Sequence, residues 1–463
     1  IIPIMLSSSC RVRVLHLNDR FRRAAFFSAD CTYHQENYPM RVLLISANSE
    51  TLYMTTLPLG LNCVAVAARN AGHDVHLLDL MGNGNSASII RDAIRKHQPH
   101  VIGISVRNID NQNMADTRFL LEPVRDTIAL CRSFSGAVIV AGGAGFSIFP
   151  EAALRYLKAD MGICGEGEVA FPALLQALEL KKNPSGIAGL CLPGSKVQGE
   201  RTEGGALGAL PLPDPSLWTV PDDVRAEIWV PLQTRRGCPM RCSYCSTPAL
   251  EGTRIRTRPA DAVVQSLSDH VAAGFKNFYF VDNTFNLPPK YAKDLCGAIA
   301  SAGLAIHWQC ILYPGFVDEE LVRKMAAAGC LEVSLGFESG FPAILKNLNK
   351  RYNVDQVRAA SELLRKHGIR RMGFLLFGGP GETRESVRKS MDFADSLELD
   401  ALVLTKGIRI YPGTALEKVA RSEGHIAGGD DLLIPRFYLA RGLDDWLDPM
   451  IGEWAADRPY CMT

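Results

Sequence analysis

Short apolar runs alternate with stretches of helical spacing from Met40 to about residue 180. Apolar runs bounded by polar residues predict buried strands, and apolar residues repeated every three or four positions predict amphipathic helices. The predicted strands are Val42–Ser46, Val75–Leu78, Val101–Val106, Ala137–Ala141 and Met161–Cys164, with helices that include Leu59–Ala71, Ala87–His97 and Leu120–Ser133. This alternation predicts an α/β domain over residues 40–180 with a doubly wound, flavodoxin-like parallel sheet.

A second βα series follows over residues 231–420. The predicted strands are Pro231–Thr234, Asn277–Val281, Ile306–Leu312, Glu332–Phe337, Met372–Phe377 and Leu402–Ile410. Helical patterns separate them at Ala260–Ala273, Tyr291–Ala302, Asp318–Ala328, Val354–His367 and Arg384–Leu397. Six repeats predict a partial (β/α)6 TIM-type barrel, with its active site at the carboxyl ends of the strands.

Three further segments complete the expected domain organisation. Residues 181–230 are rich in Gly and Pro and predict a linker, with room for a small hairpin. Residues 421–463 form a C-terminal segment. Residues 1–39 have neither steady periodicity nor the layout of a signal peptide, and a start-like Met40 follows them. We expect residues 1–39 to be an unstructured or non-native extension outside the folded domain.

Glycine-rich and polar residues follow three strands of the first domain. They are Ser105, Val106 and Arg107 after the third strand, Gly142, Gly143 and Gly145 after the fourth, and Gly165, Glu166 and Gly167 after the fifth. Any one of these segments is equally well explained as a tight turn. Because parallel strands end at one edge of the sheet, the three segments together favour a ligand site there.

Composition limits the partners. Lys and Arg (50) nearly balance Asp and Glu (49), so the net charge of +1 gives no electrostatic reason to expect nucleic acid. No apolar run reaches the length of a membrane span. Thirteen cysteines in 463 residues favour a reducing cytoplasm over a disulfide-rich secreted protein.

Three cysteines cluster in "RGCPMRCSYC" after the first barrel strand: Cys238, Cys242 and Cys245. A disulfide would leave one thiol over, and zinc would need a distant fourth ligand. Coincidental core cysteines do not suit so polar a loop. A cubane iron–sulfur cluster fits better, because three thiolates leave one iron open to bind a substrate or cofactor.

The CxxxCxxC spacing, with Tyr244 before the last cysteine, resembles the signature of the radical SAM superfamily. The resemblance implies a [4Fe-4S] cluster on the three cysteines. It also implies that the open iron binds S-adenosylmethionine (SAM), which a reduced cluster cleaves to a 5′-deoxyadenosyl radical.

Later segments resemble the superfamily in the same order. "FVDNTFN" places Asp282 and Asn283 near the SAM amino group, although many relatives carry glycines there, and "VSLGFESG" places Glu338 near the ribose. "FLLFGGPGET" places Gly378 and Gly379 near adenine and methionine, and "IRIYPGTAL" closes the pattern. Taken singly, Glu338 could cap a helix and "GGPG" could be a turn.

Six arginines surround the cysteines, at positions 235, 236, 241, 254, 256 and 258. A solvated basic face accounts for most of them by default. One or two could instead bind the SAM carboxylate or an anionic substrate.

A flavodoxin-like domain before such a barrel resembles the cobalamin-binding radical SAM class. The resemblance implies that the three glycine-rich segments of the first domain contact the corrinoid tail. The DxHxxG signature, whose histidine coordinates cobalt in many corrinoid proteins, is absent after the first strand, so we expect cobalt without a histidine ligand. His73 and His76 are interpreted as surface residues. A degenerate domain that binds no corrinoid is an open alternative.

The class implies methylation of an unactivated carbon in a small molecule or lipid, with an external electron donor such as ferredoxin or flavodoxin. A cobalamin-dependent cyclase or rearrangement is the main alternative. A carrier without catalysis would need no SAM-site segments, and a methylthiotransferase usually has a second cluster, for which the other cysteines lack close spacing. The barrel mouth and the chain from about residue 425 are the expected determinants of the substrate.

Overall fold

The computed structural model describes residues 39–48, 57–81, 86–198 and 205–462. Pro39–Thr463 forms one compact unit. The predicted extension over residues 1–39 therefore lies, apart from Pro39, outside the described residues.

The first sheet has the strand order β2-β1-β3-β4-β5-β6. Its parallel strands are β1 (Arg41–Ser46), β2 (Asp74–Asp79), β3 (Val101–Ser105), β4 (Val138–Gly142) and β5 (Met161–Ile163). The predicted flavodoxin-like order is confirmed. The sheet also gains a strand that the sequence interpretation missed: β6 (Leu190–Cys191) lies antiparallel to β5, inside the predicted linker.

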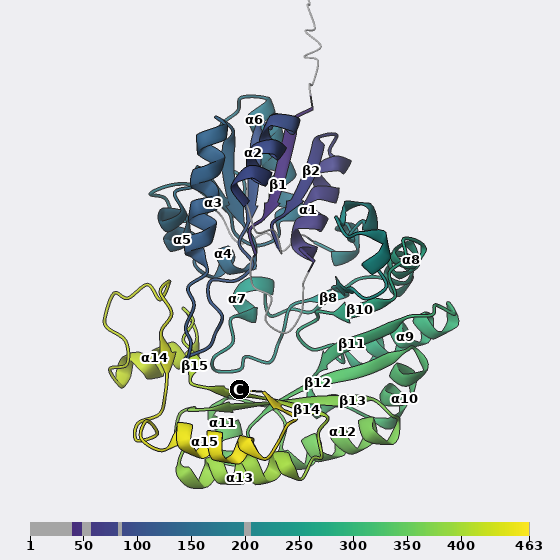
Figure 1. Ribbon diagram of the computed structural model, residues 1–463, viewed down its shortest axis with the longest axis vertical. Coiled ribbons are helices and arrows are strands. Elements are labelled where there is room, and N and C mark those ends of the chain that lie inside the picture. The colour runs from purple at the N-terminus through teal and green to yellow at the C-terminus, as the bar shows by residue number, and fades with distance from the viewer. Residues whose placement is uncertain (1–38, 49–56, 82–85, 199–204, 463) are drawn as a thin grey trace, which may run out of the picture. The chain divides into compact units, whose positions relative to one another are not determined.

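Helices cover both faces of this sheet (Figure 1). Helices α1 (Leu59–Asn70) and α6 (Gly167–Glu179) pack together, as do α2 (Ser86–His97) and α3 (Leu121–Phe134). In β1, Val42 and Leu44 belong to one apolar cluster, whereas Leu43 and Ile45 belong to the other. A strand buried on both faces has a continuous apolar run in its sequence, and this run is why the hydrophobic pattern predicted β1.

The second sheet has the order β17-β14-β13-β12-β11-β10-β7, and all its strands are parallel. They are β7 (Trp229–Leu232), β10 (Asn277–Phe280), β11 (His307–Leu312), β12 (Cys330–Glu338), β13 (Arg370–Phe377), β14 (Ala401–Lys406) and β17 (Cys461–Met462). The six predicted strands are present, but the last was predicted too long. It ends at Lys406, and Ile408–Arg409 forms β15 in a separate two-stranded sheet. Two-residue β17 extends the sheet beyond β14, and a strand this short has no periodicity to detect.

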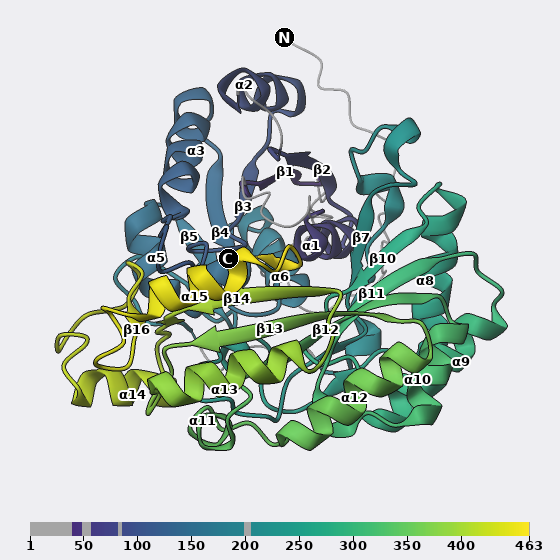
Figure 2. The ribbon, with the colours of Figure 1, turned by 60° about the horizontal axis from the view of Figure 1, so that its bottom comes forward.

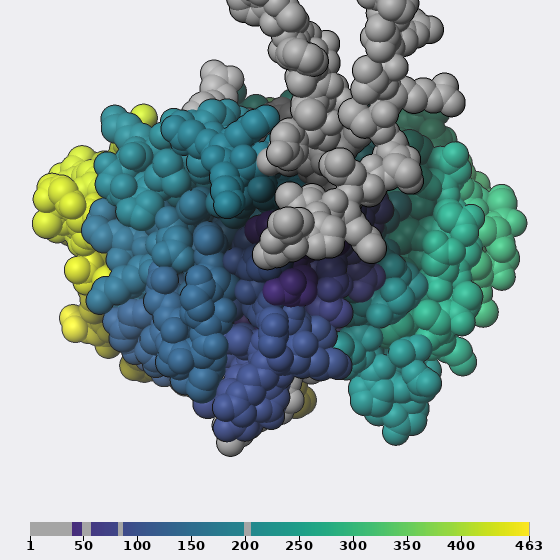
Figure 3. Space-filling model, turned by 90° about the horizontal axis from the view of Figure 1, so that it is seen from above, coloured from purple at the N-terminus to yellow at the C-terminus, as the bar shows by residue number. Residues whose placement is uncertain are grey.

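Helices cover the outer face of the second sheet, as Figure 2 shows for α10, α12 and α13. They are α8 (Ala260–Ala272), α9 (Pro289–Ser301), α10 (Glu319–Ala327), α12 (Val354–Lys366) and α13 (Arg384–Asp395), and α15 (Leu447–Ala456) lies near the C-terminus. Viewed from above, residues of the first domain, purple to blue, make up much of the visible face, and green barrel residues lie to their right (Figure 3). Within the described residues, no helix is long and apolar enough to cross a membrane.

Candidate active site

The cysteine loop lies between two short elements. Strand β8 (Arg235–Arg236) pairs with β9 (Arg256–Thr257), and the loop runs from β8 to helix α7 (Thr247–Glu251). Gly237 has φ +92°, and a Cβ there would lie 2.0 Å from the Arg254 carbonyl oxygen. Only glycine fits such a position without displacing the backbone. The motif glycine thus starts the loop at the carboxyl end of the first barrel strand.

Burial opposes the ionisation of two of the three thiols in the cysteine loop. Cys238 is buried, and Cys242 and Cys245 are half-buried. Burial, with a further contribution from neighbouring cysteines, raises the pKa of both Cys238 and Cys242. Metal coordination supplies the positive charge that offsets this effect. Among the described residues, no three Cys, His, Asp or Glu side chains converge as ligands for a single ion. The three cysteines, each able to ligate a different iron, fit a cluster as donors.

Glu251, at the end of α7, fixes the start of the loop. Its Oε2 accepts hydrogen bonds from the Gly237 N–H (3.1 Å) and from Asn283 Nδ2 (2.7 Å), and its Oε1 accepts one from Gln233 Nε2 (2.9 Å). Burial raises the pKa of Glu251. Sequence reasoning missed this residue because it belongs to no motif. The amide nitrogen of Asn283 donates to Glu251, and the expected place of Asn283 near SAM stays a prediction.

Asp282 joins the first two barrel strands. Its fully buried carboxylate accepts hydrogen bonds from Thr234 N (2.8 Å), Thr234 Oγ1 (2.6 Å) and Arg235 N (3.1 Å). Burial, partly offset by these hydrogen bonds, raises its pKa to about 6. The contacts give Asp282 a positioning role, and direct contact with SAM stays a prediction.

Glu338 and Tyr244 meet inside the barrel. Glu338, at the end of β12, has φ +60° and accepts a hydrogen bond from the Tyr244 hydroxyl on Oε1 (2.9 Å). Lys350 Nζ also binds Oε1, at 3.0 Å. Glu338 therefore does not act as a helix cap. The fold brings a predicted ribose contact beside the cysteine loop, and Lys350 is a partner that the sequence did not indicate.

The glycines after β13 form a buried turn around a second carboxylate. Gly378 has φ +101°, and a Cβ there would lie 2.6 Å from Leu439 Cδ1. The N–H groups of Gly378 and Gly379 donate to Glu382 Oε2 at 2.6 and 3.2 Å. Burial raises the pKa of Glu382 to about 7. "GGPG" therefore forms the turn that was one of its two interpretations. The other interpretation, a position beside SAM, remains a prediction.

The raised pKa of Glu382 predicts pH-dependent stability. A folded-state pKa above the usual 4.5 means that the folded protein holds this proton more tightly than the unfolded chain. The associated stability is present below about pH 4.5 and falls as the pH rises to about 7, by up to about 3 kcal/mol. The melting temperature of the wild type is therefore expected to fall relative to Glu382→Gln between pH 5 and pH 8. Glu385→Gln, which changes an exposed neighbour, should show no such trend. If the melting temperatures of the wild type and Glu382→Gln change equally with pH, the assignment is contradicted.

The arginines near the cysteines do not form a solvated face, so that interpretation is wrong for four of the six. Arg235, Arg256 and Arg258 are 1%, 6% and 3% exposed, and the Arg236 side chain is 11% exposed. Only Arg241 and Arg254 are exposed. The sequence could not reveal this, because the partners lie far away along the chain.

The buried arginines bind protein groups. Arg235 donates to the Leu287 carbonyl and the Thr284 hydroxyl. Arg258 donates to the carbonyl oxygens of Leu207 (3.2 Å), Leu210 (2.6 Å) and Pro211 (3.1 Å). These contacts hold the chain before β7 and the loop after β10 around the start of the barrel.

Arg236 and Arg256 bind the first domain directly. Arg236 lies 3.0 Å from Glu166 Oε1 and 2.5 Å from Glu168 Oε1, and Arg256 Nη2 lies 2.5 Å from Glu166 Oε1. All four side chains are at most 11% exposed. The "GEGE" segment after β5 is therefore joined to Arg236, two positions before Cys238, and to Arg256, eighteen positions after it.

The segments after β3 and β4 lie against each other at the predicted ligand edge. Val106 N donates to Gly142 O (2.7 Å), and Gly145 N donates to Val106 O (3.0 Å). A Cβ on Gly143, at φ +103°, would lie 2.6 Å from the Val106 carbonyl oxygen. Ser105 and Arg107 line a cavity of about 10 Å³. Two of the three segments expected to contact the corrinoid are thus brought together.

The same edge faces the barrel. Arg107 interacts electrostatically with Tyr279 on β10. The loop after β3 continues to Asp110, whose buried carboxylate binds Arg409 Nε of β15 (Ile408–Arg409) at 2.8 Å. Figure 1 shows this loop extending from the first sheet toward β15. Within Pro39–Thr463, the ends of both sheets therefore meet around the cysteine loop.

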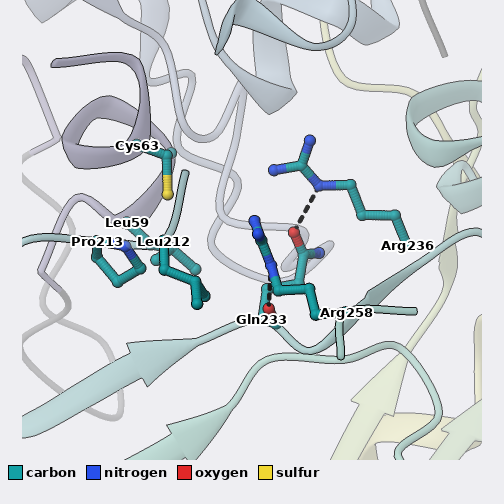
Figure 4. A pocket seen from close by; sticks show the side chains of 8 residues that line it. Leu59, Cys63, Leu212, Pro213, Gln233, Arg236 and Arg258 are labelled. Carbon is teal, nitrogen blue, oxygen red and sulfur yellow. Dashed lines mark hydrogen bonds between the residues drawn. The ribbon is translucent and has the colours of Figure 1, made fainter. Parts of the chain in front are cut away.

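A cavity of about 90 Å³ is lined by Arg236 and lies between α1 and the first barrel strand. Figure 4 shows Cys63 on one side and the guanidinium groups of Arg236 and Arg258 on the other, with Gln233 hydrogen-bonded to both. Ligand sites usually measure several hundred Å³, so this cavity is too small for SAM. We interpret it as a packing gap in the ion-pair network.

The histidines near β2 need one correction. His73 is 8% exposed rather than a surface residue, and its Nδ1 accepts a hydrogen bond from Met40 N at 3.4 Å. His76 is half-buried and stacks on His97. Both lie at or near the amino end of β2, whereas the ligand edge is at the carboxyl end. The chain where DxHxxG would stand includes residues 49–56, which lie outside the described residues.

Comparisons with known proteins agree with this geometry. Residues 45–175 match the B12 binding domain, and residues 232–394 match the radical SAM superfamily. An uncharacterized methyltransferase of Pyrococcus horikoshii is 30% identical over 392 residues, covering 82% of this chain and 83% of that protein. A tryptophan 2-C-methyltransferase of Streptomyces laurentii is 25% identical, covering 81% and 74%.

Solved structures show the same fold. The radical SAM methyltransferase TsrM from Kitasatospora setae, with cobalamin and a [4Fe-4S] cluster bound, superposes with a TM-score of 0.79 at 22% identity, covering 92% of this chain and 91% of that one. The cobalamin-dependent radical enzyme OxsB superposes with a TM-score of 0.69 at 19% identity, covering 87% and 64%.

The chain is a radical SAM enzyme with a B12 binding domain. It belongs to the methyltransferase family represented by the Pyrococcus relative. Its cofactors are a [4Fe-4S] cluster, SAM and cobalamin, and the three cysteines and the glycine-lined strand edge are chemically suited to hold the first and the last.

Proposed function

We propose that this enzyme transfers a methyl group from SAM to a carbon atom of a small molecule, with cobalamin as the methyl carrier. The observation that carries the proposal is the contact of Arg236 with Glu166 and Glu168, because it joins the cysteine loop to the predicted corrinoid edge. When bound, the cluster and SAM supply one-electron chemistry, and cobalamin supplies the methyl group.

The chain's own residues bind and orient in this proposal. Cys238, Cys242 and Cys245 hold the cluster. Tyr244, Glu338, Gly378 and Gly379 form the SAM site, with Asp282 and Asn283 fixing the strand ends beside it. The edge formed by residues 105–107, 142–145 and 165–167 holds cobalamin. The buried Arg236–Glu166 contact fixes the cysteine loop relative to the corrinoid edge.

We also propose the domain limits 40–180, 181–230, 231–420 and 421–463, and an external donor such as ferredoxin or flavodoxin. A small-molecule substrate is favoured by the names of several relatives, which include a tryptophan 2-C-methyltransferase and a bacteriochlorophyllide d C-12(1)-methyltransferase. A methylthiotransferase of Geotalea uraniireducens and a putative one of Methanocaldococcus jannaschii match only 37% and 59% of this chain.

The test is cobalamin-dependent formation of S-adenosylhomocysteine from SAM. The full chain is reconstituted anaerobically with iron and sulfide, with or without hydroxocobalamin, then given SAM and a strong reductant. We expect about one S-adenosylhomocysteine per bound cobalamin, and none without it. Release of S-adenosylhomocysteine independent of cobalamin would contradict methyl transfer by this route, as would a chain that keeps no corrinoid absorbance after desalting.

A further inference from the structure

Three consecutive residues after helix α11 (Pro342–Asn347) hold the cysteine loop. The Leu348 carbonyl accepts a hydrogen bond from Ser243 N (3.0 Å), and Asn349 Nδ2 donates to the Arg241 carbonyl (2.6 Å). Lys350 Nζ donates to the Tyr244 hydroxyl at 2.9 Å. The segment 348–350 therefore contacts the loop between its first and last cysteines.

Lys350 places a buried positive charge at this contact. Its side chain is 6% exposed, and Nζ lies 3.0 Å from Glu338 Oε1 and 5.2 Å from the centre of the Tyr244 ring. Cys242 is among the groups with which Lys350 interacts electrostatically. Charges in such a buried setting are weakly screened by water and salt. Lys350 and Glu338 thus set opposite charges beside one cluster ligand.

We propose that Lys350 is a positioning residue that holds the cysteine loop against Glu338 and raises the reduction potential of the cluster. Reduction adds an electron to a cluster already bound by three thiolates. A nearby ammonium group stabilises the more negative reduced form, and a nearby carboxylate destabilises it. Removing Lys350 and removing the Glu338 charge should therefore shift the potential in opposite directions. The proposal rests on the cluster assignment and not on methyl transfer.

The experiment is a redox titration followed by EPR, on the full chain with a reconstituted cluster and without SAM. Lys350→Met is expected to shift the midpoint to a more negative potential, and Glu338→Gln to a more positive one. Lys346→Met removes an exposed lysine from α11 and should leave the midpoint unchanged. The double variant Lys350→Met/Glu338→Gln should lie between the two single variants. Iron and sulfide are measured for each variant, so that only fully loaded protein is compared.

A general loss of loop structure would not produce shifts of opposite sign. An unchanged midpoint in loaded Lys350→Met, or a shift in the same direction in both single variants, would overturn the proposal. If Lys350→Met binds too little iron, Glu338→Gln decides alone, and a midpoint that is unchanged or more negative refutes the proposal. Because SAM and cobalamin are absent, failure here would leave the methyl-transfer test unaffected.

Discussion

The Cys242→Ser variant is expected to cleave SAM reductively at least about a thousandfold more slowly, as is typical when one member is removed from a set of groups that act as a unit. A serine hydroxyl does not ionise at neutral pH and is a poor ligand for cluster iron, so one corner of the cluster is left unsupported. Lys350 and Tyr244, which flank this corner, cannot replace a thiolate. The iron content per chain and the 5′-deoxyadenosine formed from SAM under a strong reductant measure the effect.

Cys461→Ser is the matched control for Cys242→Ser. Cys461 is also a free, half-buried thiol, but it lies in β17 at the far edge of the barrel sheet. We expect this variant to keep its iron and its turnover. Full turnover in Cys242→Ser, or equal losses in both variants, would refute the assignment of the cysteine loop.

Glu166→Ala should produce the second large effect, a loss of about 3–5 kcal/mol of stability, the usual cost of breaking a buried ion pair. The change leaves Arg256, only 6% exposed, without its carboxylate partner, and it removes one of the two partners of Arg236. Because the network joins the corrinoid edge to the cysteine loop, retention of cobalamin should fall as well. Melting temperature and corrinoid absorbance after desalting measure the two effects.

Glu122→Ala, an exposed glutamate of the same domain, serves as the control for Glu166→Ala. Surface substitutions of this kind usually change stability by no more than about 0.5 kcal/mol. A melting temperature for Glu166→Ala equal to that of the control would show that the ion pairs contribute little.

The sequence predicted most strands well because the parallel strands of both sheets are covered by helices. Buried strands such as β1, with Val42 to Ile45 all apolar, stand out from the amphipathic helices between them. Strands β6 and β17 were missed because two residues carry no period. The cysteine spacing and the glycine-rich strand ends were visible because their function depends on local spacing.

The supporting side chains could not be predicted in the same way. Glu251 and Lys350 belong to no motif, and Glu382 lies in "FLLFGGPGET" without being singled out by that pattern. Each of the three acts through partners set by the folded chain. The basic surroundings of the cysteines suggested a solvated face, yet Glu166 and Glu168 bury Arg236 from about 70 residues away. Charge pairs between distant segments leave no periodic signal in a sequence.

The most direct test of the account is the EPR spectrum of the reduced, reconstituted chain before and after SAM is added. The account predicts about four irons and four sulfides per chain, and a clear change in the cluster signal when SAM binds the iron that no cysteine holds. A spectrum that saturating SAM leaves unchanged, although the cluster is fully loaded, would contradict the claim that Cys238, Cys242 and Cys245 leave one iron open for SAM.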